Sequence, residues 1–445
     1  MCGSVKKVCQ FEDTRVKLII IIQQIIILIL LLCLPWDQYE RRFKGWWKKY
    51  WQKPKQARHR RPRDPSSCAA CCSAQHLANQ ERGQASPWEQ VKSRRGRPKA
   101  HSSGGYACMN PRCPYYKVTD ERVHGLRRDG IRNQEGTPQW ECGYCDSKRT
   151  AWYGTVQYRL KTHSDTVRQA IHMQMKGMCA ADISEILEVP PDTVQGWLDR
   201  AARHSQRLHQ RLFKDLVLHY IQLDELATKV RNRSKQVWVW TGMDLTTRLW
   251  VAWVVGDRSQ QEANGLLHQI YRRLRHDITP AFTSDGLNQY FYAITPHWAS
   301  WEVVEGKRKP VWVVAKALLY GQLKKVRTRY KLRQITTTML CGERAAMRDY
   351  LQALGLSDNI QTAFVQRLNL SLRHIVPALR RRTWALANNI RSLRLRVALG
   401  AAYYNFCRPH QALPMGNKHL LTPAMAAGVT DHRWTVQEFL LHPVY

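Results

Sequence analysis

The segment Leu216-Val217-Leu218-His219-Tyr220-Ile221-Gln222-Leu223 leads directly into Asp224-Glu225-Leu226. Its density of Leu, Val and Ile is typical of a β-strand inside a folded core. The stretch therefore predicts a strand that ends in a carboxylate, Asp224. Because side chains alternate between the two faces of a strand, the Glu225 side chain is predicted to point to the opposite face.

More strands and a helix are predicted after this strand. Two strands joined by a turn, a helix and a short strand follow in the order Gln236–Met243, residues 244–247, Leu249–Val255, Gln260–Arg275 and Ala281–Ser284. Three strands, a helix and a further strand make an α/β order. The last strand ends in a second carboxylate, Asp285, whereas Asp244 is assigned to the turn without a metal role.

Asp224 and Asp285 are the candidate ligands of a catalytic metal site. Neighbouring strand ends can bring the two side chains together, although they are far apart in the sequence. Paired carboxylates suit phosphoryl transfer, in which Mg²⁺ or Mn²⁺ ions need hard oxygen ligands. For either residue alone, an ordinary aspartate at a strand end is the simpler interpretation, so the prediction rests on the pair.

The composition indicates a polyanionic partner. The 445 residues include 70 Lys and Arg against 34 Asp and Glu, a formal net charge of +36. Such a self-repelling excess is most naturally neutralised by nucleic acid. Basic residues recur from Lys6 to Arg408, which favours a long footprint on double-stranded DNA over a few basic tails. Binding through phosphates should weaken steeply as salt rises.

A four-thiolate zinc site is predicted in the middle of the chain. Two close pairs supply the ligands, Cys108 with Cys113 and Cys142 with Cys145. Each pair can offer two sulfurs from one turn, which suits the tetrahedral coordination of structural Zn²⁺. The alternative is a set of unrelated reduced thiols. The turn-like run from Cys142 to Cys145 favours zinc, and so small a module has too little core to fold without it.

A helix-turn-helix unit is predicted between Ser164 and Gln210. Ser164 and Asp165 are expected to cap its first helix. Spacings of three and four residues place one apolar stripe on each of three helices. The inward-facing residues of the three helices are Val167, Ile171 and Met175; Ile183, Ile186 and Leu187; and Val194, Trp197 and Leu198. A turn over Glu188–Pro191 precedes the third helix.

The outward side of the third helix predicts contacts with double-stranded DNA. Its candidate side chains are Thr193, Gln195, Arg200 and Arg203. A helix in the major groove offers such groups to base edges. A small helical bundle without DNA contacts has the same spacing, and Gly196 weakens the helix by about 1 kcal/mol relative to Ala. The basic composition and the preceding zinc module favour DNA binding.

An apolar segment, Leu18–Leu34, stands near the start of the chain. It is interrupted by Gln23 and Gln24 and is followed by Pro35. It therefore reaches only the short limit of a membrane span, about 17–25 residues. We weigh a membrane anchor against an upstream extension that is not part of the expressed protein, and we favour the second. In either case the basic residues that follow would keep the rest of the chain in the cytoplasm.

Residues 46–105 are predicted to form a basic, mostly disordered linker, because they are rich in Lys, Arg, Pro, Ser and Gln. Within the linker, residues 94–99 could lie in a minor groove or, more simply, contact only phosphates. Cys68, Cys71 and Cys72 are interpreted as free thiols. The chain has 13 cysteines without the spacing of a disulfide framework, which favours a reducing compartment. We expect a cytoplasmic, nucleoid-associated protein.

The order of these motifs supports a family resemblance. The chain from Tyr106 to Leu413 resembles the insertion-sequence-one family of bacterial transposases, which move insertion sequences, a class of mobile element. The matching motifs are the paired cysteines, the helix-turn-helix, Leu223-Asp224-Glu225-Leu226, Ser284-Asp285-Gly286, the helix from Phe364 to Arg373, Tyr403-Tyr404-Asn405 and Arg408-Pro409-His410. Individually the motifs are short, but their order is specific.

The resemblance implies a ribonuclease-H-like core with a metal triad of two Asp and one Glu. Asp224 and Asp285 correspond to the two aspartates. The implied activity is DNA transposition, a form of DNA recombination in which the protein binds terminal inverted repeats and target DNA and then cuts and joins strands. Joining two ends implies a homo-oligomer assembled on the DNA.

One position departs from the family pattern. Where the pattern has its third acid, immediately before Arg367, this chain has Gln366. An amide oxygen can touch magnesium but carries no charge, so catalysis should suffer. Three interpretations stay open: an inactive DNA-binding remnant or repressor, a weak enzyme that uses Gln366 with water, and recruitment of another acid such as Glu343 or Asp358. We favour the first.

Five regions are predicted along the chain. Residues 1–105 hold the apolar segment and the linker, 106–160 a zinc ribbon, 161–212 the helix-turn-helix, 213–414 the ribonuclease-H-like core, and 415–445 a C-terminal tail. Arginines near the third-acid position, Arg367 and Arg373 with Arg380, Arg381 and Arg382, are expected to hold DNA phosphates, although a solvated helix face is the simpler alternative.

Overall fold

The computed structural model describes residues 101–445, apart from residues 122, 124, 133, 307, 330, 358, 414, 417 and 418. The predictions for Leu18–Leu34, for the linker up to residue 100 with Cys68, Cys71 and Cys72, and for Asp358 lie outside the described residues. Within the described part of the chain, no helix is both long and apolar enough to cross a membrane.

A six-stranded mixed sheet forms the centre of the structure, with the strand order β11-β10-β7-β4-β5-β6. Its strands are β4 (Tyr220–Val230), β5 (Arg233–Asp244), β6 (Trp250–Gly256), β7 (Ala281–Asp285), β10 (Tyr320–Thr328) and β11 (Lys331–Cys341). β4, β5 and β6 pair antiparallel, whereas β7 runs parallel to both β4 and β10. The predicted α/β class is confirmed.

The first predicted strand continues well past Asp224. It was expected to end at Leu223, but β4 runs to Val230 because its pairing with β5 continues through Thr228 and Val237. Asp224 therefore lies inside β4. Its parallel neighbour β7 is shorter, and their pairing ends at Leu223 and Ser284. Asp224 is thus placed where the ladder between β4 and β7 ends.

Helices cover both faces of this sheet. α8 (Gln260–Tyr271) packs against β5 and β6, and the short α9 (Gln289–Ile294) lies beside α8. α11 (Ala363–Ile375) contacts β4 and β5. α12 (Ile390–Ala402) packs on β6, and a single π-helical turn, Tyr403–Cys407, continues it. α10 (Arg344–Ala353) contributes Met347 and Leu351 to a second, smaller apolar cluster.

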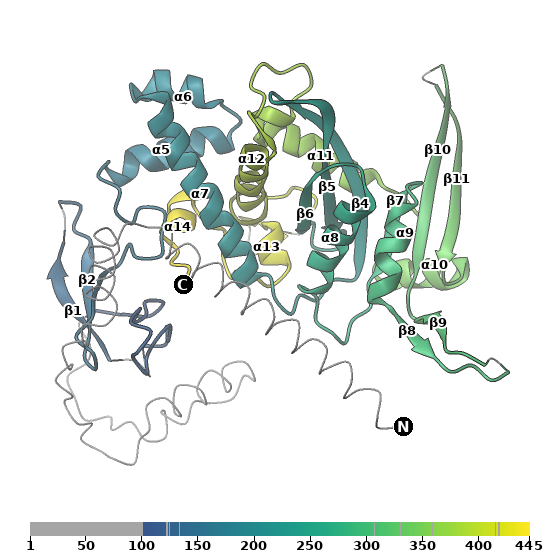
Figure 1. Cartoon of the computed structure of the whole chain (residues 1–445), viewed down its shortest axis with the longest axis horizontal. Helices are drawn as coiled ribbons and strands as arrows, with labels where there is room; N and C mark the ends of the chain where they lie inside the picture. The colour runs from purple at the N-terminus through teal and green to yellow at the C-terminus, as the bar shows by residue number, and fades with distance from the viewer. Residues whose placement is uncertain are drawn as a thin grey trace, which may run out of the picture.

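Two hairpins extend from the sheet. β10 and β11 continue beyond their pairing with the rest of the sheet and project at the right of Figure 1. β8 (Ala299–Glu302) and β9 (Val311–Val314) form a separate two-stranded hairpin. This hairpin carries an exposed tryptophan, Trp301, which makes an edge contact with Trp312.

The N-terminal part of the described chain contains two small units, at the left of Figure 1. The first is an antiparallel sheet of β1 (Leu126–Ile131), β2 (Pro138–Cys142) and β3 (Lys148–Thr150). The second consists of α5 (Ser164–Met175), α6 (Ala180–Leu187) and α7 (Pro191–Leu212). α7 is long and also packs on α12, so it links these helices to the central sheet.

Most of the predicted apolar stripes of α5–α7 are buried, with exceptions at the edges. Ile186 is 55% exposed, so α6 packs mainly through Ile183, with Ala180 and Leu187 half-buried beside it. The N-cap of α5 is His163, whose side chain accepts a hydrogen bond from the Asp165 backbone. The predicted cap at Ser164 is wrong by one residue, because the Ser164 hydroxyl donates to Glu135 instead.

Residues after 414 pack against the rest of the protein. They include β12 (Met415–Gly416), β13 (His419–Leu420), α13 (Pro423–Ala426) and α14 (Val436–Leu441). Phe439 is fully buried, and its carbonyl accepts a hydrogen bond from the ring of His204 on α7 at 3.2 Å. The Val444 backbone N–H donates to the carbonyl of Gly154. The segment expected to form a tail is therefore part of the packed structure.

Candidate functional site

The four predicted zinc ligands lie together. One ligand atom from each of Cys108, Cys113, Cys142 and Cys145 falls within 4.8 Å of the others. The Sγ atoms of Cys108 and Cys145 are 3.5 Å apart, and those of Cys113 and Cys142 are 3.8 Å apart. Three of the four cysteines are buried. This four-cysteine cluster could hold a structural zinc ion.

The thiols of the four-cysteine cluster shift one another's pKa in opposite directions. A hydrogen bond from the Cys108 thiol lowers the pKa of Cys142, and the same bond raises the pKa of Cys108. Burial raises the pKa of Cys113 to about 12. A bound cation would favour the thiolate form of every ligand, because metal ligation requires the deprotonated sulfur.

A second cluster forms at the centre of the sheet. Oxygen atoms of Asp224, Glu225 and Asp285 all lie within 4.8 Å of one another, and we call these three residues the acid cluster. The predicted meeting of Asp224 and Asp285 is therefore found in the structure. Glu225 points to the opposite face of β4 from Asp224, as predicted, yet its carboxylate also reaches the cluster.

Glu225 joins the cluster although it follows the alternation of β4. Asp224 faces α11, where its carboxylate accepts a hydrogen bond from Asn369 Nδ2 at 2.8 Å. Glu225 faces the α8–α9 side, where it accepts hydrogen bonds from Arg258 and from the Tyr290 hydroxyl. Because β7 ends at Asp285, no strand separates the two faces beyond that point. Both carboxylates can therefore approach Asp285 around the end of β7.

Burial raises the pKa of all three carboxylates, and neighbouring carboxylate charges add to this effect at Asp224 and Glu225. Burial, together with the charges of Glu225 and Asp285, raises the pKa of Asp224 to about 7. Burial and the charge of Asp285 raise the pKa of Glu225, and burial raises that of Asp285. Arg258 opposes these effects at both Glu225 and Asp285. Like charges this close are stable as anions only when a cation neutralises them.

The residue that α11 presents to Asp224 is Asn369. Gln366, at the position of the expected third acid, is exposed and contacts Thr362 at 3.3 Å and Lys325 at 3.4 Å. Asn369 lies one helical turn after Gln366. Sequence reasoning missed Asn369, although its spacing of three from Gln366 placed both on one side of the helix. Glu343, another acid considered for the cluster, is exposed just before α10.

The start of α11 is fixed by a buried side chain of β4. Gln222 donates to the Gln361 carbonyl at 2.7 Å and accepts from the Val365 backbone N–H at 3.1 Å. Gln222 and Asp224 lie on the same face of β4. These two contacts therefore set the position of α11, and with it Asn369, over Asp224. Asp244, as predicted, serves a turn and accepts hydrogen bonds from Thr246 and Thr247.

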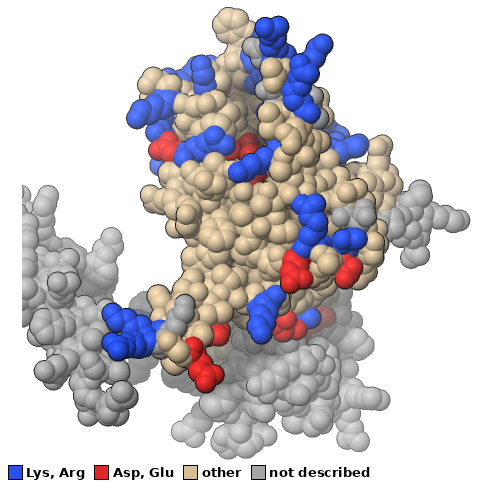
Figure 2. Space-filling model, turned by 90° about the vertical axis from the view of Figure 1, so that its right-hand side faces the viewer, with Lys and Arg blue, Asp and Glu red and all other residues tan. Residues whose placement is uncertain are grey.

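Basic side chains surround the acid cluster. Lys324 packs over Gly286, so closely that a Cβ added to this glycine would lie 2.7 Å from the lysine side chain. Arg373 is half-buried on α11, and its pKa is lowered by burial and by Arg381 but raised by the charge of Asp224. Arg367 is exposed on the same helix, but it lies on the side of Arg248 and Tyr404, where its charge lowers the pKa of both. On the face drawn in Figure 2, basic side chains gather toward the β10–β11 end and acidic ones form small patches.

Two of the four predicted DNA-contacting residues of α7 are engaged within the chain. Arg396 and Asp199 contact the Gln195 side chain, and Arg200 donates to the carbonyl of Tyr158. Their predicted outward orientation is therefore wrong. At Gln195 the cause is the packing of α7 on α12, which carries Arg396. Arg200 is engaged by the segment before α5. Thr193 and Arg203 are exposed as expected.

Comparison with known proteins adds no family assignment. No protein-family model matches the chain, and no curated protein matches its sequence.

Proposed function

We propose that this chain is a DNA strand-transfer protein of the transposase type, built on a ribonuclease-H-like core. The observation that carries the proposal is the acid cluster, three carboxylates gathered at the end of a central parallel strand. Three antiparallel strands, a helix and a parallel strand occur in the order expected of such a core. The resemblance to insertion-sequence-one transposases and the net charge of +36 support the same function.

The acid cluster fits a divalent cation. It offers three hard oxygen ligands within 4.8 Å of one another. Burial, together with the charges of Glu225 and Asp285, raises the pKa of Asp224 to about 7. Asp224, Asp285 and Glu225 would hold Mg²⁺ or Mn²⁺. The bound metal supplies activation of an attacking water or 3′ hydroxyl and stabilisation of charge on the phosphate. In this proposal Glu225 provides the third charge that Gln366 lacks.

The neighbouring residues have positioning roles. Asn369 holds the Asp224 carboxylate, and Arg258 with Tyr290 holds that of Glu225. Lys324, Arg367 and Arg373 are suited to contact phosphates of the strand being cut. Thr193 and Arg203, at the exposed side of α7, remain candidates for contacts with terminal inverted repeats, with α5–α7 acting as the helix-turn-helix. The assembly on DNA would be a homo-oligomer, associated with the nucleoid.

Strand cleavage tests this function. The full chain is incubated with a DNA duplex that carries the ends flanking its coding sequence, with and without magnesium. We expect magnesium-dependent nicking at the ends, and we expect Asp285→Asn to lower the rate by about a hundredfold or more, because transition-state charge stabilisation is lost. The control is Asp277→Asn, an exposed aspartate paired only with Arg275. Equal cleavage by wild type and Asp285→Asn contradicts the proposal.

A non-catalytic DNA-binding protein is the second candidate. Gln366 favours it, because this residue is exposed and makes hydrogen bonds with Thr362 and Lys325. A remnant or repressor of this kind binds the element ends with unchanged affinity when Asp285 is replaced. It shows no magnesium-dependent nicking in any variant. The same cleavage and binding measurements therefore separate the two candidates.

A further inference from the structure

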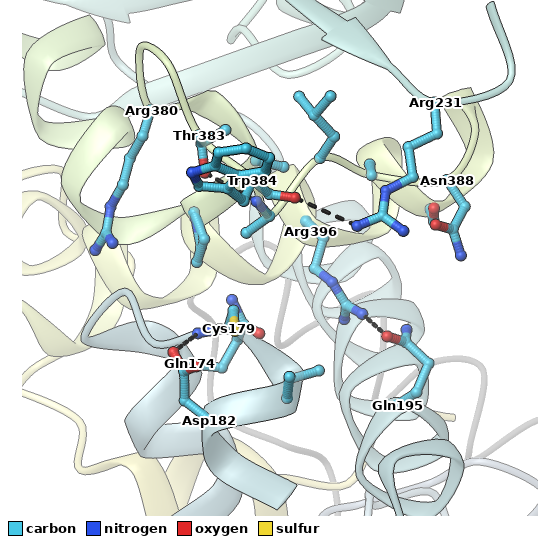
Figure 3. Close-up of a pocket in the computed structure, with 18 of the residues that line it drawn as sticks. Gln174, Cys179, Asp182, Gln195, Arg231, Arg380, Thr383, Trp384, Asn388 and Arg396 are labelled. Atoms are coloured by element: carbon cyan, nitrogen blue, oxygen red, sulfur yellow. Dashed lines mark hydrogen bonds between the residues drawn. The ribbon is translucent and has the colours of Figure 1, made fainter.

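A large pocket separates the α5–α7 unit from the segment that follows α11. Its volume is about 830 Å³, within the range of about 300–1,000 Å³ that ligand pockets occupy. One wall is formed by α6 and α7, and the other by residues 377–389 and the start of α12. Figure 3 shows these two walls facing each other, with Trp384 on one side and Cys179 and Asp182 on the other.

The pocket is strongly basic. Five arginines line it against two aspartates: Arg231, Arg380, Arg381, Arg382 and Arg396, with Asp182 and Asp199. Within the described part of the chain, Arg381 and Arg382 are exposed and have no hydrogen bond or ion pair to protein groups. Their charges are therefore available to an anion such as a phosphate.

A highly exposed tryptophan side chain, Trp384, lies at the mouth of this pocket. The Trp384 side chain is 94% exposed, the highest exposure among the large apolar residues of the described chain. Its backbone is nevertheless fixed, because Arg231 donates to its carbonyl at 3.3 Å and Thr383 Oγ1 accepts from the next backbone N–H. Arg382, two residues before, holds the left-handed conformation at φ 53°. The segment therefore holds the indole face out to solvent, where a second aromatic ring could stack on it.

The two walls are fastened to each other. Arg380 donates to the carbonyl of Gly177, in the turn between α5 and α6, at 2.7 Å. Gly177 has φ 92°, and a Cβ there would lie 2.2 Å from the carbonyl oxygen of His374. Arg396 on α12 donates to Gln195 on α7, as drawn in Figure 3. The pocket is therefore preformed between the two units.

We propose that this pocket binds an unpaired nucleotide of a DNA strand, with its base stacked on Trp384 and its phosphates held by Arg381 and Arg382. This inference rests on the proposed function and names the form of DNA that the protein holds. A base inside a duplex is stacked on its neighbours and has no free face for an indole. Only a nucleotide that has left the duplex can use both the aromatic face and the basic groups of the pocket.

The pocket is connected to the acid cluster through α11. Asn369 contacts Asp224 near the middle of this helix, and Arg373, one turn later, is electrostatically coupled to both Asp224 and Arg381. The segment that carries Trp384 follows directly after the end of α11. A strand whose phosphates pass along Arg373 thus reaches Arg381 and Trp384. The pocket would hold a displaced nucleotide close to the strand being cut.

Equilibrium binding of the full chain to labelled DNA tests the proposal. Two duplexes of identical sequence are compared, one fully paired and one with a short unpaired segment, in magnesium-free buffer without chelator so that zinc is retained. We expect Trp384→Ala to weaken binding to the DNA with the unpaired segment by about tenfold or more, as loss of one base stack does. Its affinity for the fully paired duplex should be unchanged.

Matched variants sharpen this test. Trp384→Phe should restore most of the lost affinity, because it keeps an aromatic face. Trp301→Ala, an exposed tryptophan on β8, should change neither affinity. Arg381→Gln should weaken binding to the DNA with the unpaired segment more than binding to the fully paired duplex, because Arg381 is proposed to hold phosphates of the nucleotide in the pocket. A 2-aminopurine placed in the unpaired segment should be quenched by the wild type and not by Trp384→Ala.

Each outcome bears on a separate claim. If Trp384→Ala weakens both DNAs equally, or neither, the pocket does not hold an unpaired base and the inference is overturned. Because no cleavage is measured, this result is independent of the metal chemistry. A chain that binds unpaired DNA through Trp384 but never nicks the ends leaves the inference standing and contradicts only the proposed function.

Discussion

The four-cysteine cluster and the acid cluster bring together similar numbers of ligand atoms at similar distances, yet they differ in every other respect. The thiols come from turns of a small three-stranded unit, and three of the four are buried. The carboxylates come from two strands of the largest sheet and are only partly buried. Structural zinc sites are closed in this way, whereas catalytic sites keep positions open to substrate.

The two clusters also differ in their neighbouring side chains, which are apolar around the cysteines and basic around the carboxylates. The four cysteines contact mainly one another and apolar neighbours such as Leu126. The acid cluster is bordered by Lys324, Arg258 and Arg373, charges that an approaching phosphate could meet. This difference fits the proposal that the acid cluster serves chemistry, whereas the four-cysteine cluster could hold a structural zinc ion. Four changes test that division, beginning with the largest expected effect.

Replacing Cys142 by Ser should unfold the three-stranded unit. Zinc binding contributes about 10–16 kcal/mol in comparable small modules, and the unit buries only a few apolar side chains besides the cysteines, such as Leu126, Val118 and Trp140. We expect loss of bound zinc and loss of hydrogen-exchange protection in β1–β3, while β4–β7 stay protected. The control is Cys341→Ala, a cysteine of β11 outside the cluster. Retained protection in β1–β3 without zinc contradicts a structural role.

Replacing Glu225 by Gln should lower the rate of end cleavage by about tenfold or more, because one charge that neutralises the metal is removed. The half-maximal magnesium concentration should also rise. Tyr290→Phe is the matched control, since it removes only a hydrogen bond to the same carboxylate. If both variants lose activity equally and neither changes the magnesium dependence, Glu225 only supports Arg258 and is no metal ligand.

Replacing Gln366 by Glu should raise the cleavage rate, by about tenfold or less. The change restores the acid that the family pattern expects, but Lys325 lies 3.4 Å from this side chain and competes for the new charge. Gln352→Glu adds the same charge on exposed α10 and serves as the control. An unchanged rate, with Glu225→Gln strongly impaired, means that Glu225 has fully replaced the third acid.

The sequence predicts which residues come together in the two clusters, but it predicts the ends of the strands less well. The Asp224 and Asp285 pair and the four cysteines were predicted from strand ends and spacing, and both sets lie together. The end of β4 was misplaced by seven residues, since Asp224-Glu225 looked like a strand end. Pairing with β5, a tertiary contact, extends the strand past these charges.

The contribution of Glu225 could not be predicted from alternation alone. Alternation fixes the face of a side chain, but the short length of β7 lets carboxylates from both faces meet. The same limit applies to helices, where periodicity gives the face of a side chain but not its neighbours. Examples are Asn369, Gln195 and Arg200. Periodicity on α7 could not indicate that α12 covers one of its sides, nor which turn of α11 would face Asp224. Trp384 has no periodic signal at all, because it lies in an irregular segment.

The smallest expected effect concerns the stability of the acid cluster as pH changes. Neighbouring charges and burial raise the pKa of Asp224 from 3.8 to about 7. The folded protein therefore keeps a proton that the unfolded chain releases, and stability is lost as pH rises from about 4 towards 7. Asp224→Asn removes this penalty. In magnesium-free buffer we expect it to raise Tm by about 2 °C or more at pH 8, and by less at pH 5.

Magnesium should reverse the order of Tm between the wild type and Asp224→Asn at pH 8. In the wild type at pH 8, added magnesium neutralises the ionised cluster and should raise Tm, because a ligand that binds only the folded state stabilises it. Asp224→Asn should gain much less. Asp277→Asn, at an exposed site where Arg275 lowers the pKa, should show no stabilisation at either pH. A wild-type Tm indifferent to both pH and magnesium would mean that the three carboxylates are neutralised within the protein, and the contrast with the four-cysteine cluster would disappear.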